Sequence, residues 1–174
     1  MSKIQIFFLL FLPFIGCLQK KNVNIQHFYV EQPSSKWFEV QEGGADFAWY
    51  NKDIYGSIYV DSNCKQKFED RPLKDSYLSL TQGIIIGQPL QQNIRIIDNR
   101  EALFTIQNGN IDGIAIRLAS IVMSKDECLY DFLYIAPPDV FDTGLKDFLY
   151  AVQSFRSTPK ETEGLPKPSK NDSK

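Results

Sequence analysis

The chain of 174 residues is long enough for one folded domain with appended segments. Its 43% hydrophobic and 23% charged residues are ordinary values for a globular protein. The formal net charge of −2 and the scattered Lys and Arg residues argue against nucleic acid as a partner. The single histidine, His27, leaves little material for histidine-based chemistry.

The first 17 residues have the pattern of an export signal. Met1–Lys3 is a short basic segment, and residues 4–15 are almost wholly apolar. This apolar run is too short for a transmembrane helix, which needs roughly 20 residues. Gly16-Cys17 closes the run, and the whole order resembles the signal of bacterial lipoproteins, with Phe14 standing where leucine is usual.

The lipoprotein resemblance implies that residues 1–16 are removed and that Cys17 is lipidated on its sulfur and its amino group. Two or more acyl chains hold a protein stably on a membrane, because each buried methylene contributes about 0.8 kcal/mol. Leu18, rather than aspartate, follows the cysteine, which favours the outer membrane of the bacterial cell envelope. The alternatives are an ordinary signal peptide and a buried N-terminal helix with an inert cysteine.

The remaining chain divides into three segments by composition. Residues 17–36 are mostly polar and predict a lipidated tether, with a small apolar cluster at 27–30 that leaves room for a short first strand. Residues 37–155 predict the folded domain. Residues 156–174 are rich in Pro, Ser, Lys and Glu and predict a disordered tail, because this composition cannot bury a core.

The first half of the predicted domain contains three strands and a helix. Aromatic-rich strands are expected over 36–40, 45–51 and 55–62, the last two joined as a hairpin. The helix is expected over 71–83, with Pro72 in its first turn and Gly83 at its end. Its apolar face would be formed by Leu73, Tyr77 and Leu80.

The second half predicts a meander of strands followed by a helix. Strands are expected over 93–98, 101–107, 111–123 and 128–136, and their short connections make neighbours antiparallel. Asn108-Gly109 is expected to form one of the hairpin turns. The final helix is expected over about 142–155, with an apolar stripe of Leu145, Phe148, Leu149, Val152 and Phe155.

This order of elements predicts an α+β fold, an antiparallel sheet with helices packed on it. Together with the terminal helix ending in "VQSFR", the order resembles the PsbP-like fold, an α/β/α sandwich, over residues 37–155. PsbP-like proteins are mostly non-catalytic accessory or assembly modules. The resemblance therefore implies a role of that kind.

Two cysteines remain in the mature domain. Cys64 ends a predicted strand and Cys128 begins another, and export to an oxidising compartment favours a disulfide between them. The alternatives are two free buried thiols and a metal site. A metal is disfavoured because the sequence has no CxxC and its one histidine lies in the predicted tether.

Asp131 is a carboxylate among apolar residues of one predicted strand, where Leu129, Leu133 and Ile135 share its face. Such a group needs a raised pKa or a cationic partner. Arg117, in the adjacent predicted strand, is the candidate partner. A structural ion pair is favoured, and a polar spot within a binding cavity is the alternative.

Aromatic residues gather in the first three predicted strands. Core packing is the favoured interpretation, and stacking on sugar or lipid at an exposed patch is the alternative. The residues concerned are Trp37, Phe38, Phe47, Trp49, Tyr50, Tyr55 and Tyr59.

The sequence contains no recognisable catalytic set. Ser/His/Asp and Cys/His catalysis would both need His27, and the glycine-rich segments lie at predicted hairpin turns. We therefore expect a non-enzymatic, lipid-anchored envelope protein, without cofactor or metal, that binds another envelope protein. The alternative is a carrier of a small apolar ligand or lipid in a cavity between sheet and helices. An exposed apolar patch would favour protein binding, and an enclosed apolar cavity would favour the carrier.

Overall fold

The computed structural model describes residues 28–41, 44–64 and 70–158. Seven of the strands form one antiparallel sheet in the order β2-β3-β4-β8-β7-β6-β5, and β1 pairs separately with β9. The predicted α+β class, with helices packed on an antiparallel sheet, is confirmed. The elements are β1 (Phe28–Tyr29), β2 (Phe38–Glu39), β3 (Phe47–Asn51), β4 (Gly56–Cys64), α1 (Leu73–Leu80), β5 (Gln91–Ile97), β6 (Arg100–Ile111), β7 (Ile114–Lys125), β8 (Cys128–Ala136), α2 (Phe141–Ser154) and β9 (Arg156–Ser157).

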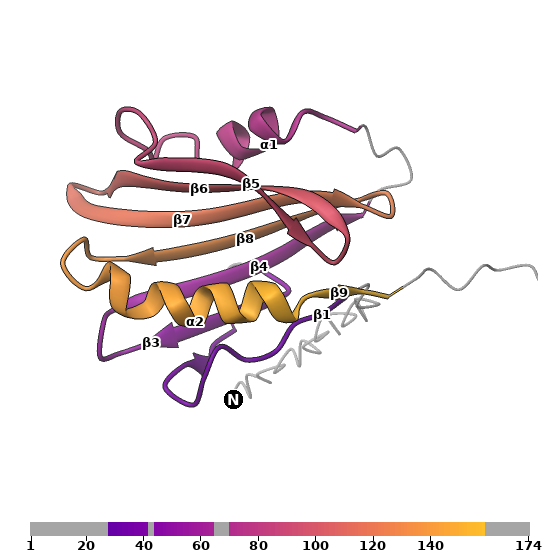
Figure 1. The fold of residues 1–174 in the computed structure, drawn as a ribbon. Coiled ribbons are helices and arrows are strands. Elements are labelled where there is room, and N and C mark those ends of the chain that lie inside the picture. Colours follow the sequence, from indigo (N-terminus) through magenta and orange to yellow (C-terminus); the bar gives the residue numbers. More distant parts are fainter. Residues whose placement is uncertain (1–27, 42–43, 65–69, 159–174) are drawn as a thin grey trace, which may run out of the picture.

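The two helices cover opposite faces of the sheet, with α2 running along the strands in Figure 1 and α1 lying at the β5–β6 side. Successive side chains of β8 point to opposite faces of the sheet. Tyr130 belongs to the core under α2, and Leu129 packs against the cluster under α1. The predicted apolar stripe of α2 packs entirely into the larger core. The predicted face of α1 packs on β6 and β7, and its members are Leu73, Tyr77 and Leu80.

The folded domain begins earlier and ends later than the predicted range of 37–155. Phe28 and Val30 are buried, and the Phe28 ring lies 5.4 Å from the Tyr130 ring and 5.7 Å from the Phe155 ring. Strand β1 pairs with β9, so Ser157 is also part of the fold. Residues 28–36 are therefore domain rather than tether. Residues 1–27, with the predicted lipid site, and the tail from 159 lie outside the described residues.

A cluster of polar contacts holds β9 to the sheet. Asp98, in the β5–β6 turn, accepts hydrogen bonds from Lys125 Nζ and from the Ser157 backbone N–H, the latter at 3.0 Å. Burial alone would raise the pKa of Asp98, but the donors of Lys125 and Ser157 outweigh it and leave that pKa below its ordinary value. Both termini of the described chain therefore lie at one end of the fold, beside the β5–β6 and β7–β8 turns.

The predicted turn at Asn108-Gly109 is wrong. Strand β6 continues to Ile111, and the turn to β7 is formed by Asp112 and Gly113, with φ of 52° and 86°. Positive φ at both central residues is the requirement of a two-residue hairpin turn of type I′. Both dipeptides are turn formers, so the choice between them was made by strand pairing and not by local preference.

Gly109 has a different function, which is to let another backbone approach closely. The segment before β5 runs beside β6, with a bridge between Ile85 and Gly109. A Cβ at Gly109 would lie 2.7 Å from the carbonyl oxygen of Ile84, closer than such atoms can approach. A glycine inside a strand commonly marks such an approach.

Candidate functional site

Cys64 and Cys128 form a disulfide, the pairing that the sequence favoured. They lie opposite each other where β4 ends and β8 begins. Both strands are central in the sheet, so the bond joins two neighbours rather than holding a loop. Its position indicates a structural role at the end of the domain where the chain enters and leaves.

The predicted pair of Arg117 and Asp131 does not form. In the register between β7 and β8, Arg117 lies opposite Ala136, whereas Asp131 lies opposite Val122. Arg117 Nε instead donates a hydrogen bond to Asn108 Oδ1 at 3.1 Å, and its guanidinium lies 5.6 Å from the centre of the Phe141 ring. The two residues share adjacent strands but are separated along them, which strand content alone does not reveal.

Asp131 instead lies directly opposite another carboxylate, Asp61 of β4. Burial is the main cause that raises the pKa of Asp131 to about 7, and the nearby charge of Asp61 adds to it. Burial, followed by the charge of Asp46, also raises the pKa of Asp61. Asp131 Oδ1 is buried without a hydrogen-bond partner. A carboxylate in this position takes up its proton at a higher pH than an exposed carboxylate does, so Asp131 is partly protonated near neutral pH.

The buried hydroxyl of Ser120 lies on the same face of the sheet as Asp131, the face that α1 covers. Ser120 lies on β7 opposite Leu133, one residue pair beyond the pair of Val122 and Asp131 on the same face. Its side chain is fully buried and its oxygen has no hydrogen-bond partner. Two buried oxygens without partners on one face identify a polar site within the sheet. Because both oxygens are out of contact with solvent, a substrate could not reach them without a change in structure.

The aromatic cluster of the first strands is mainly core. Trp37 and Trp49 are buried, and the indole N–H of Trp37 donates a hydrogen bond of 2.8 Å to Asp147 on α2. The Phe47 ring stacks on Trp49 at 5.4 Å. Phe38 and Tyr55 are the exceptions, with 54% and 74% of their surface exposed. Tyr55 lies in the turn between β3 and β4, and Phe38 lies on β2 opposite Tyr50, close to that same end of β3.

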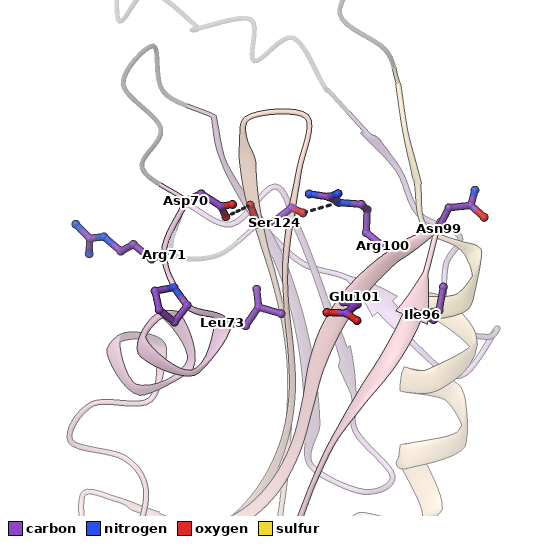
Figure 2. Close-up of a pocket in the computed structure, with 9 residues that line it drawn as sticks. Asp70, Arg71, Leu73, Ile96, Asn99, Arg100, Glu101 and Ser124 are labelled. Carbon is purple, nitrogen blue, oxygen red and sulfur yellow. Dashed lines mark hydrogen bonds between the residues drawn. The ribbon is translucent and has the colours of Figure 1, made fainter.

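One cavity of about 400 Å³ lies between the start of α1 and the ends of β5, β6 and β7 (Figure 2). Seven of its nine lining residues are exposed, so it is a surface hollow rather than an enclosed chamber. Ser124 lies at its centre, donating a hydrogen bond to Asp70 and accepting one through its backbone oxygen from Arg100. The lining is mixed in charge, and it is not the apolar cavity that a lipid carrier requires.

The exposed apolar side chains separate by type across the described residues. All of the exposed aromatic ones lie outside the region from α1 to the β6–β7 turn, whereas all of the large aliphatic ones lie within it. We call this second group the aliphatic side. Its members are Leu78, Ile86, Leu90, Ile94, Ile96, Ile111 and Ile114.

The aliphatic side has two parts. Ile94 and Ile96 lie two positions apart on the same face of β5, the edge strand of the sheet, and are 52% and 68% exposed. Ile111 and Ile114 face each other at the tip of the β6–β7 hairpin, where β7 extends beyond its partner β8. This hairpin tip is at the end of the sheet opposite the β1–β9 pair. The sequence signal for the aliphatic side was the isoleucine content of segments 84–86 and 94–96 and of positions 111 and 114. Only the tertiary structure shows which of these isoleucines are exposed.

Within the described ranges, no group of three or more His, Cys, Asp or Glu side chains is arranged to hold a metal ion. No helix in that part of the chain is both long and apolar enough to cross a bilayer.

No protein-family model matches the sequence, and comparison with curated proteins likewise finds no match. Solved structures of similar fold do exist. The chain is similar to the cyanobacterial PsbP protein of Synechocystis, CyanoP, at 14% identity over 78% of this chain and 95% of that one, with a TM-score of 0.53. It is also similar to a structure from Bacteroides thetaiotaomicron at 11% identity and TM-score 0.53, over 80% of this chain and 51% of that one.

A third similar structure is LpqN of Mycobacterium tuberculosis, which is described as involved in cell envelope biogenesis. The identity is 10%, the TM-score is 0.54, and the match covers 76% of this chain and 83% of LpqN. At such identities the likeness concerns the fold alone. The comparisons and the antiparallel sheet between two helices together show that this chain has the PsbP-like α+β fold.

Proposed function

We propose that the protein is a lipid-anchored, non-enzymatic module of the bacterial envelope that binds another envelope protein through its hairpin tip. The observation that carries the proposal is the exposed isoleucine pair at the tip, 38% and 68% exposed on Ile111 and Ile114. Exposed apolar side chains grouped at one place are typical of protein interaction sites.

The placement of the tip supports this proposal. The chain enters the domain at the opposite end, where β1 pairs with β9. Strand β7 has 12 residues and, at about 3.4 Å per residue, spans roughly 40 Å. An anchor at Cys17 would therefore hold the β1–β9 end of the domain near the membrane. The hairpin tip, at the other end, would then point away from the membrane towards a partner.

The two competing functions have less support. A lipid carrier needs an enclosed apolar cavity, and the hollow in Figure 2 is open and lined with charged side chains. An enzyme needs accessible ionisable groups. The most perturbed carboxylate, Asp131, has an oxygen that is buried away from solvent, and raised pKa values also occur at structural sites.

The proposed contact is tested by placing a photo-crosslinking amino acid at Ile114 in living cells. The matched control is Tyr150, an exposed residue of α2 on the other face of the sheet. We expect a reproducible cross-link from position 114 to one other envelope protein, and none to that protein from position 150. Cross-links from 114 to lipid alone, or the same products from both positions, would contradict the proposal.

The anchor has its own test. Metabolic labelling with palmitate should mark the protein, and the Cys17→Ala variant should lose the label and be released from the membrane fraction. Labelling that persists in Cys17→Ala would show that another residue carries the lipid or that no lipobox is used.

A further inference from the structure

Strand β5 is an edge of the sheet. It has seven residues, and among the described residues it has one hydrogen-bonded neighbour, β6, so no other described strand pairs with its outer backbone groups. Edge strands are normally shortened, bulged, or given prolines and charges, which prevent pairing with another chain. The opposite edge follows this rule, because β2 has only two residues.

Strand β5 has no proline and no bulge, and it carries a single charge. Its only charged residue is Arg95, whose guanidinium lies 4.0 Å from the centre of the Phe104 ring in its own chain. Phe104 belongs to the core under α2, so Arg95 points to that face. On the α1 face, Gln92, Ile94 and Ile96 form an uncharged row, since Gln92 bonds to Thr105 and side chains alternate.

We infer that β5 pairs antiparallel with β5 of a second copy of this chain, joining two sheets into one. The inference rests on the proposed function, because anchoring in one membrane raises the effective concentration at which two copies meet. A two-fold axis perpendicular to the sheet keeps the α1 faces of both copies on one side. The register that pairs the whole strand with itself sets Gln91 opposite Ile97 of the second copy and Ile94 opposite Ile94.

This register is also the one that the charges favour. It sets Arg95 opposite Asn93 of the second copy, so no like charges meet. A shift of the axis by one residue towards the end of the strand would set Arg95 opposite Arg95, which is destabilising. In the favoured register Ile96 lies opposite Gln92 of the second copy, so the Ile94 pair lies at the centre of the joint with one Ile96 on each side of it.

The register gives a test by cysteine cross-linking of the full-length protein in its own membrane. Directly opposite residues of antiparallel strands have Cα atoms about 4.5–5.5 Å apart, within the range for a disulfide. Ile94→Cys should therefore form a disulfide-linked dimer on a non-reducing gel. Ile96→Cys alone should form several-fold less, because its two copies would be separated by about 14 Å along the strands. Co-expression of Ile96→Cys with Gln92→Cys should restore the dimer.

The outcomes separate this inference from the proposed function. A monomeric Ile94→Cys protein that is anchored and keeps its Cys64–Cys128 bond would overturn self-pairing, as would equal dimer from Ile94→Cys and Ile96→Cys or a disulfide from 94 to a different protein. The photo-cross-link from Ile114 is then measured in an Ile94→Lys background. If the cysteine test fails but the cross-link to another envelope protein persists in this background, self-pairing is wrong and the proposed function stands. If position 114 reaches no other protein, the proposed function itself has failed.

Discussion

At the scale of single residues, the polar groups inside the sheet are the least expected feature. The sequence correctly identified Asp131 as a carboxylate that needs a partner or a raised pKa. It named the wrong neighbour, because the choice between Arg117 and Asp61 depends on which strands are adjacent and in what register. The result is a like-charge pair in which burial, helped by Asp61, raises the pKa of Asp131 to about 7.

Asp131 makes stability depend on pH in a direction opposite to that of most carboxylates. Because its folded pKa lies above its unfolded value of about 3.8, the native state binds the proton more tightly. The free energy of unfolding should fall as pH rises from about 4 to 7. Asp131→Asn should remove this dependence and raise the unfolding free energy by on the order of 2 kcal/mol at pH 8, with little effect near pH 4.

Urea unfolding at both pH values measures the effect of Asp131→Asn, with Asp126→Asn in the exposed β7–β8 turn as the control. The same change in stability at the two pH values would show that Asp131 is ionised throughout and that its burial is compensated in another way.

Gly109 supports a second prediction at this scale. Gly109→Ala would bring a methyl group against the Ile84 carbonyl oxygen, so the segment before β5 must move away from β6. We expect a loss of about 1–3 kcal/mol in the free energy of unfolding. Thermal or urea unfolding measures it, with Gln91→Ala as an exposed control on β5. An unchanged stability would mean that the 84–86 segment is not tightly held.

At the scale of elements, the helices were predicted well and the strand pairings only in part. The apolar faces of α1 and α2 follow from residues three and four apart, which is a local property. The β6–β7 turn was misplaced because Asn108-Gly109 and Asp112-Gly113 are both favourable turns. The predicted disulfide implies the register between β4 and β8. Cys64 opposite Cys128 fixes a register in which paired numbers add to 192, and 192 minus 131 gives Asp61.

The disulfide should contribute strongly to the stability of these elements. Cys64 and Cys128 are 64 positions apart, and the chain-entropy model gives about 4 kcal/mol for a loop of this size. The variant Cys64→Ser with Cys128→Ser should therefore lose about 2–4 kcal/mol in urea unfolding. The single variants provide the comparison, since each leaves a free thiol. A double variant as stable as the wild type would show that strand pairing alone holds this end of the sheet.

At the scale of the whole molecule, the fold class was predicted but its boundaries and exposed surfaces were not. The order of elements predicts helices on an antiparallel sheet, and the similar structures have that fold. The strand order places β5 at an edge and β8 at the centre, although both read as apolar strands in the sequence. The aliphatic side is therefore a property of tertiary structure, which could not be derived from periodicity.

Two truncations test the end of the domain. Removal of residues 159–174 should leave the melting temperature nearly unchanged, because the composition of this segment predicts no packed core. Removal of residues 156–174 also deletes β9, with the pairing to Phe28 and the hydrogen bonds to Asp98. We expect that variant to melt several degrees lower in calorimetry. Equal melting temperatures would mean that β9 adds nothing to the fold.

The most direct test of the proposed function combines the anchor with the tip. A photo-crosslinking residue at Ile114 is compared in two full-length backgrounds, wild type and Cys17→Ala, in living cells and at matched protein levels. An anchored domain that presents its tip to an envelope partner predicts a single dominant cross-linked protein in the wild type and a large loss of that product in Cys17→Ala. No cross-link in the wild type, or equal cross-linking in both backgrounds, would contradict the account.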